Sequence, residues 1–146
     1  MAFITATLAS DAYSALRSNM PGWKAQAQNA LSYIQTNSIN SDYVFSLLNN
    51  LNGLISSISV ASGVSGLNAY ATSLGYSGTI VSDAAAVSSA AQACITWVTS
   101  NFPKDTGGFI QAYTLNADGT RTAASFTPTQ TSGLQTALTS LIATIQ

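Results

Sequence analysis

The sequence predicts one mainly α-helical domain over residues 1–146, a bundle of five or six helices with one β-hairpin inserted before the C-terminal helix. Over most of the chain, apolar residues recur at spacings of three and four, the period of a helix with one buried face. Around residues 108–126 the period changes to alternation, which is typical of strands. A length of 146 residues suits one domain and allows about two-thirds of the unfolded surface to be buried.

The first two helices are predicted over residues 5–19 and 23–34. We expect Pro21-Gly22 to break the helix between them, because proline lacks a backbone donor and glycine is a poor helix former. The apolar faces are formed by Leu8, Ala12, Leu16 and Met20 in the first helix, and by Trp23, Ala27, Ala30, Leu31 and Ile34 in the second.

The third helix, over residues 41–58, has the strongest amphipathic pattern in the front half of the chain. We expect Ser41 or Asp42 to cap it, because their side-chain oxygens can accept hydrogen bonds from the free N–H groups at a helix start. A connection then leads to a short helix within residues 64–74. Gly75 follows at the point where a helix end often requires a left-handed residue.

The next long helix is predicted over residues 82–102, with Ser82 or Asp83 at its cap. An acidic residue there also meets the positive end of the helix dipole. Pro103 is expected to end this helix, because the residue before a proline disfavours helical angles.

The hairpin is predicted within residues 108–126, with the turn at 116–119, Asn-Ala-Asp-Gly. A single hairpin is marginal in water, so it must pack on the helices or on another chain. The last helix begins with a capping box of Thr127 and Gln130 around Pro128. Its apolar stripe continues to Ile145, which predicts burial against the bundle or a neighbouring chain.

Charge is almost missing from the chain. Only 6 % of residues are charged, where about 25 % is usual, and the net charge is −1. Four scattered cations cannot form a basic groove for nucleic acid or a polybasic membrane anchor. There is no signal-peptide pattern and no run of about 18 apolar residues, so we expect neither nucleic acid nor a membrane as a partner.

Catalytic and metal chemistry also lack their usual residues. The absence of histidine removes the commonest general base and metal ligand, and the five aspartates are widely separated. Cys94 has no base beside it in the sequence and is expected to be a buried apolar residue. The sequence therefore predicts no catalytic residue, no cofactor or metal site, and no enzymatic activity.

Aromatic and C-terminal apolar side chains are the candidates for interfaces, since aromatic residues are enriched there. Core packing is the alternative for each of them. Trp97 is one candidate because it lies about 100° around its helix from Val98, away from the main apolar stripe. The full set is Trp97, Phe109, Tyr113, Leu138, Leu141, Ile142 and Ile145, with Trp23, Tyr13 and Tyr33 as further residues of interest.

The second half of the chain resembles small helical virion structural proteins of tailed bacteriophages, of the head–tail connector or adaptor type. The resemblance lies in residues 66–71, Asp83, 94–98 and 101–103, and then in 115–121, 126–127 and 134–142. It implies a structural part of a phage particle, which would assemble in the host cytoplasm. No catalytic residue is implied.

The composition favours the same class of protein. Neutral amides and hydroxyls cost less to bury than ions, and low charge weakens the repulsion between copies. The leading hypothesis is a ring of this chain, twelve-fold by analogy, between the portal and the tail. One alternative is a capsid cement protein or tail component, and another is a small monomeric binding module of the cytoplasm.

Overall fold

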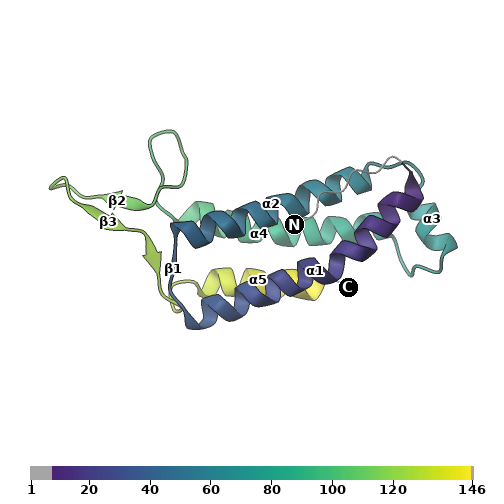
Figure 1. Ribbon diagram of the computed structural model, residues 1–146, viewed down its shortest axis with the longest axis horizontal. Coiled ribbons are helices and arrows are strands. Elements are labelled where there is room, and N and C mark those ends of the chain that lie inside the picture. Colours follow the sequence, from purple (N-terminus) through teal and green to yellow (C-terminus); the bar gives the residue numbers. More distant parts are fainter. Residues whose placement is uncertain (1–7, 146) are drawn as a thin grey trace.

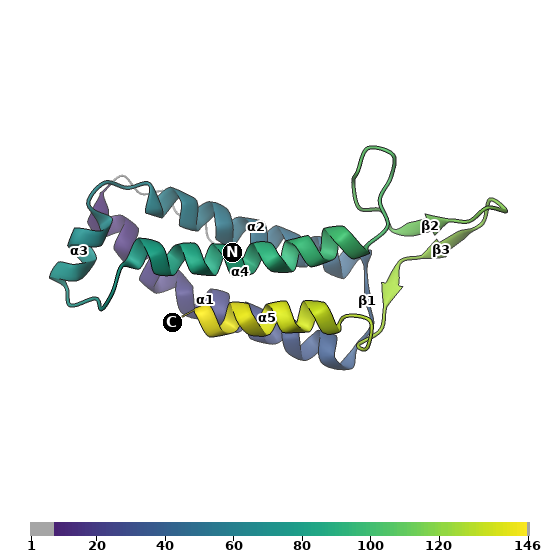
Figure 2. The same ribbon diagram turned by 180° about the vertical axis from the view of Figure 1, so that it is seen from behind.

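The structure, a computed structural model, describes residues 8–145 and confirms a mainly helical fold with small antiparallel strand pairs toward the C-terminus. Four long helices lie side by side, each antiparallel to its neighbours: α1 (Ala9–Thr36), α2 (Ser41–Ser62), α4 (Ile80–Asn101) and α5 (Ser132–Thr144) (Figure 1). The short α3 (Leu67–Ser73) lies at one end of these helices, between α2 and α4 in the sequence. Figure 2 shows α4 and α5 side by side on the face opposite α1 and α2.

The predicted break at Pro21-Gly22 is wrong, because α1 is one helix of 28 residues with Pro21 inside it. Proline removes one hydrogen bond and its ring crowds the carbonyl four residues earlier, which bends a helix where it does not end it. Figure 1 shows such a bend between the purple and the blue parts of α1. Met20 and Trp23, on either side of the break, are both buried in the core. Their burial holds the two segments in one helix. The predicted start at residue 5 lies outside the described residues.

Two predicted helix caps are also wrong. Asn40, not Ser41 or Asp42, caps α2 and accepts a hydrogen bond from the Tyr43 N–H at 3.0 Å. Ser41 is buried instead, and its hydroxyl donates to the Gln111 carbonyl at 3.3 Å.

The other wrong cap is that of α4, which begins at Ile80, before Ser82 and Asp83. The Asp83 carboxylate accepts a hydrogen bond from the Tyr76 hydroxyl. Burial, together with this bond and the charge of Asp83, raises the pKa of Tyr76 to about 12. In both helices the predicted capping residue bonds to a group outside its own helix instead: Ser41 to a carbonyl 70 positions away, and Asp83 to a hydroxyl seven positions before it.

Two other local predictions are confirmed, and a third is confirmed only in part. Thr127 and Gln130 make the two hydrogen bonds of a capping box, with the Thr127 N–H donating to Gln130 Oε1 at 2.9 Å and the Gln130 N–H to Thr127 Oγ1 at 3.4 Å. They do not cap the last helix, however, because these residues form a turn and α5 begins at Ser132, with Thr131 at its N-cap. Gly75 is left-handed with a φ of 89°. Helix α4 ends at Asn101, with Phe102 extended before Pro103.

The hairpin is present but shorter than predicted. Strand β2 (Tyr113–Leu115) pairs with β3 (Arg121–Ala123), whereas the preceding residues form a loop closed by an isolated bridge between Lys104 and Ile110. A second pair, β1 (Ile39–Asn40) with β4 (Ser125–Phe126), was not predicted. Strands of two residues have too few positions to show alternation.

Helix α2 has the length and apolarity of a membrane-spanning segment, with a mean hydropathy of 1.3 over its most apolar stretch. Its apolar stripe, however, faces the other helices: Val44, Leu47, Leu51, Leu54 and Ile58 are all buried. Packing within the bundle accounts for this composition.

The side chain of Trp97 joins α4 to the start of α5. Its ring meets the Phe126 ring edge to face, with centroids 6.2 Å apart. It also lies against Gly133, where an added Cβ would come within 2.5 Å of the Trp97 Nε1 atom. Gly133 is therefore required by this close approach of backbone and ring.

Gly133→Ala is predicted to destabilise the protein by about 1–3 kcal/mol, because the new methyl group overpacks against Trp97. The matched control is Gly22→Ala in α1, where nothing lies within 4 Å of the added Cβ. That change is expected to stabilise by about 1 kcal/mol through helix propensity. Urea unfolding followed by circular dichroism measures both; equal effects of the two substitutions would contradict the close contact.

Candidate functional site

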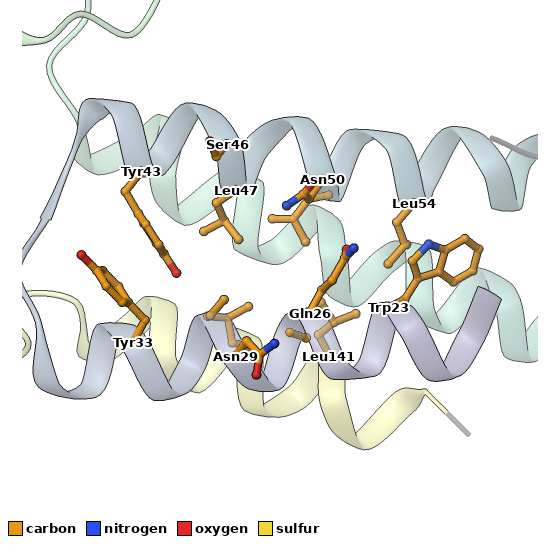
Figure 3. Close-up of a pocket in the computed structure, with 14 residues that line it drawn as sticks. Trp23, Gln26, Asn29, Tyr33, Tyr43, Ser46, Leu47, Asn50, Leu54 and Leu141 are labelled. Atoms are coloured by element: carbon orange, nitrogen blue, oxygen red, sulfur yellow. The ribbon is translucent and has the colours of Figure 1, made fainter. Parts of the chain in front are cut away.

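A groove with a volume of about 350 Å³ lies between α1 and α2. Its floor is apolar and buried, and includes Leu138 and Leu141 of α5, which close it from below. The other floor residues are Ala27 and Ala30 of α1 and Leu47, Leu51 and Leu54 of α2. We call this hollow the α1–α2 groove. Figure 3 shows its side chains pointing toward one another from the two helices.

Aromatic side chains stand at the two ends of the groove (Figure 3). At one end the rings of Tyr33 and Tyr43 are stacked, with centroids 4.6 Å apart and planes 14° from parallel. Burial, and to a smaller degree the neighbouring Tyr33, raises the pKa of Tyr43, so this phenol stays neutral at ordinary pH. At the other end stands Trp23, which is only 2 % exposed.

The Trp23 ring nitrogen is a buried donor, and it has no hydrogen-bond partner among the described residues. In Figure 3 this nitrogen lies on the side of the ring toward Gln26 and Leu54, that is, toward the groove. Buried indole N–H groups usually find an acceptor, since an unpaired one costs free energy. One end of the groove thus lies against an unpaired donor that has less than 1 Å² of exposed surface.

Polar but uncharged side chains border the groove: Gln26, Asn29, Ser46 and Asn50. None of the fourteen described residues that line it is an acid, a lysine or an arginine. With amides, hydroxyls and an indole N–H, this lining can bind and orient a molecule, but it offers no general base near neutral pH.

Sequence reasoning missed the groove, although it noted Trp23 and Tyr33 as residues of interest. A usable signal was present. Gln26, Asn29 and Tyr33 recur at spacings of three and four along α1, beside its apolar stripe. Tyr43, Ser46 and Asn50 repeat the same spacing along α2. Two matching polar and aromatic stripes on neighbouring helices indicate a shared, partly open edge.

A second candidate surface is the projecting segment of residues 103–123, which we call the arm. It extends from the end of the bundle opposite α3 (Figure 1). Phe109 in its loop is 71 % exposed and Leu115 in β2 is 62 % exposed, the two highest values among the large apolar side chains of the described residues. The arm therefore carries apolar side chains that this chain does not cover.

Local contacts give the arm a defined shape. The Asp105 carboxylate accepts from the N–H groups of Gly107 and Phe109 at 2.9 and 3.0 Å. At the hairpin turn Asp118 accepts from both the hydroxyl and the N–H of Thr120, and these bonds lower the pKa of Asp118. The Arg121 guanidinium lies 4.3 Å from the centre of the half-buried Tyr113 ring.

The candidate interface residues fall into two groups. Phe109 is exposed on the arm, while Tyr113 of the arm and Trp97 beside its base are half-buried. Leu138, Leu141 and Ile145, by contrast, lie in the chain's own core, and Ile142 is half-buried against it. The α5 stripe fills the space between α1 and α4, so these core side chains are not free to contact a partner.

Cys94 is buried in α4, and burial raises the pKa of its thiol to about 11. No three histidine, cysteine or acidic side chains lie together within residues 8–145. Cys94 is thus a core residue in the described structure.

A thiol-specific disulfide reagent is predicted to label native Cys94 at least about a hundredfold more slowly than an ordinary thiol. A pKa of about 11 instead of 9 lowers the thiolate fraction by that factor, and burial blocks access as well. Labelling rates near neutral pH, with and without guanidinium chloride, measure this. Rapid labelling of the native protein would contradict the burial.

A comparison of the chain with known protein families, curated proteins and solved structures finds no match.

Proposed function

We propose that this protein is a structural subunit of a tailed-phage virion, a head-to-tail connector adaptor that forms a ring between portal and tail. The observation that carries the assembly role is the exposure of Phe109 and Leu115 on the arm, whose local hydrogen bonds give it a defined shape. A partner that covered these side chains would remove apolar surface from water, which favours association.

The energetics of the hairpin support a partner for the arm. A two-stranded hairpin is marginal by itself, and β2 and β3 each have only three residues. All three residues of β3 are exposed. A neighbouring subunit that covers Phe109 and Leu115 would remove apolar surface from water and stabilise the strand pair.

The scarcity of charge supports contacts between copies. An interface made of hydroxyls, amides and apolar groups avoids the cost of removing ions from water. With a net charge of −1, copies of the chain repel each other little. In the proposed ring, the bundle of helices forms the wall around the channel and the arm reaches the next subunit, the portal or the tail.

The virion setting rests on the resemblance in the second half of the chain, which includes the arm and α5. Capsid cement and tail component remain the alternatives within the same class. Symmetry separates them: a connector forms a closed ring, because its head-to-tail contacts must close on themselves.

Replacement of both apolar side chains of the arm, Phe109→Ser with Leu115→Thr, is predicted to abolish self-assembly while the fold is retained. Both residues are exposed in the single chain, so circular dichroism is expected to stay unchanged, and so is thermal stability at concentrations where the wild type is monomeric. Light scattering after size-exclusion chromatography and negative-stain images measure the assembly of the wild type and the variant.

The matched control is Leu74→Ser, which removes a 56 % exposed leucine in the connection between α3 and α4, at the opposite end of the bundle. This variant is expected to assemble like the wild type. A wild-type protein that stays monomeric at high concentration would contradict the proposal, and so would equal loss of assembly in the control.

A second function, a monomeric binding module, is favoured by one observation, the α1–α2 groove of about 350 Å³. This volume lies within the range of small-molecule sites. A stable monomer that binds a ligand in the groove would support this alternative.

A further inference from the structure

We propose that the α1–α2 groove binds a small uncharged amphiphile, an elongated apolar molecule whose terminal hydrogen-bond acceptor takes the N–H of Trp23. The inference goes beyond the assembly role and does not depend on it. Each property of this ligand follows from a separate feature of the groove.

The apolar body follows from the floor. The side chains beneath the groove are alanines and leucines, and all are buried. An alkyl chain or a ring laid on this floor would exclude water from it, which is the main source of affinity in pockets of this kind.

The acceptor follows from Trp23. Its indole nitrogen stands at one end of the groove, has less than 1 Å² of exposed surface and lacks a partner among residues 8–145. A ligand oxygen that reaches this nitrogen when the side chains covering it shift would satisfy the donor, whereas a ligand without an acceptor would leave it unpaired. This requirement orients the ligand, with its polar end at Trp23.

The absence of charge follows from the lining. Within the described lining only Tyr33 and Tyr43 can ionise at all, and burial keeps Tyr43 neutral. An ionised ligand would lose its hydration without gaining a counter-ion. The bordering Gln26, Asn29 and Asn50 amides can both donate and accept, which suits a neutral polar group.

The elongated shape follows from the two aromatic ends. Trp23 and Tyr33 are ten positions apart on α1, a rise of about 15 Å. The stacked Tyr33–Tyr43 pair closes the end opposite Trp23 (Figure 3). A chain of medium length laid between them would contact both helices along its whole body.

The test uses three probes with the same number of carbons: methyl octyl ketone, which is neutral with an acceptor; decane, which lacks the acceptor; and decanoate, which is charged. The ¹⁵N-labelled protein has two indole N–H groups, Trp23 and Trp97, and Trp97→Phe assigns their signals. The ketone is expected to shift the Trp23 signal and leave that of Trp97 unchanged. Decane and decanoate are each expected to bind about tenfold more weakly.

Two variants separate the groove from non-specific binding. Trp23→Phe keeps a ring but loses the donor, and is expected to reduce ketone affinity to that of decane. Ala30→Leu fills the floor and is expected to abolish binding, whereas Ala25→Leu, an exposed position on the same helix, is expected to have no effect. Circular dichroism confirms that each variant is folded.

The proposal is overturned if saturating ketone leaves the Trp23 signal in place, if decanoate binds as tightly as the ketone, or if Trp23→Phe retains full affinity. A Trp23 signal that moves with protein concentration and not with ketone would also overturn it, and would assign the groove to a second copy. The Phe109→Ser, Leu115→Thr variant is expected to keep full ketone affinity. A failure of the assembly proposal can therefore be distinguished from a failure of the ligand-binding proposal.

Discussion

Burial of the apolar stripe of α5 is the contact on which the rest of the molecule depends. Leu134, Leu138, Leu141 and Ile145 are almost completely removed from water, and α5 makes its contacts with both α1 and α4. Through Leu138 and Leu141 the same helix supplies the floor between α1 and α2. Without this stripe, α1 would lose a helix that it packs against besides α2, and the groove would have no base.

The contacts made by the segment just before α5 also hold the arm in place. Strand β4 pairs with β1, the link between α1 and α2, so two connections far apart in the sequence are tied together. Beside them Trp97 packs between Phe126 and Gly133. Because the two ends of the arm are connected to α4 and β4, the arm projects from the bundle. The molecule therefore combines a tightly packed core with two apolar surfaces that the described chain leaves open, the arm and the groove.

Local sequence signals predicted local features well. The hydrogen bonds between Thr127 and Gln130, the left-handed Gly75 and the helix end before Pro103 each depend on residues close in the sequence, although α5 itself begins later, at Ser132. The predictions failed where a contact outside the helix competed. Ser41 and Asp83 are good capping residues, but the structure uses them to bind Gln111 and Tyr76. Pro21 is a good helix breaker, but Met20 and Trp23 bury the face that continues past it.

The sequence by itself determined the helical class, the approximate helix ranges, the hairpin and the neutrality of the surface, because periodicity and composition act within one element at a time. Only the tertiary structure decided what each apolar face contacts. The C-terminal stripe that suggested an interface is core, since α5 packs between α1 and α4. The groove exists because α1 and α2 do not close over the leucines of α5, a relation among three helices that no single stripe contains.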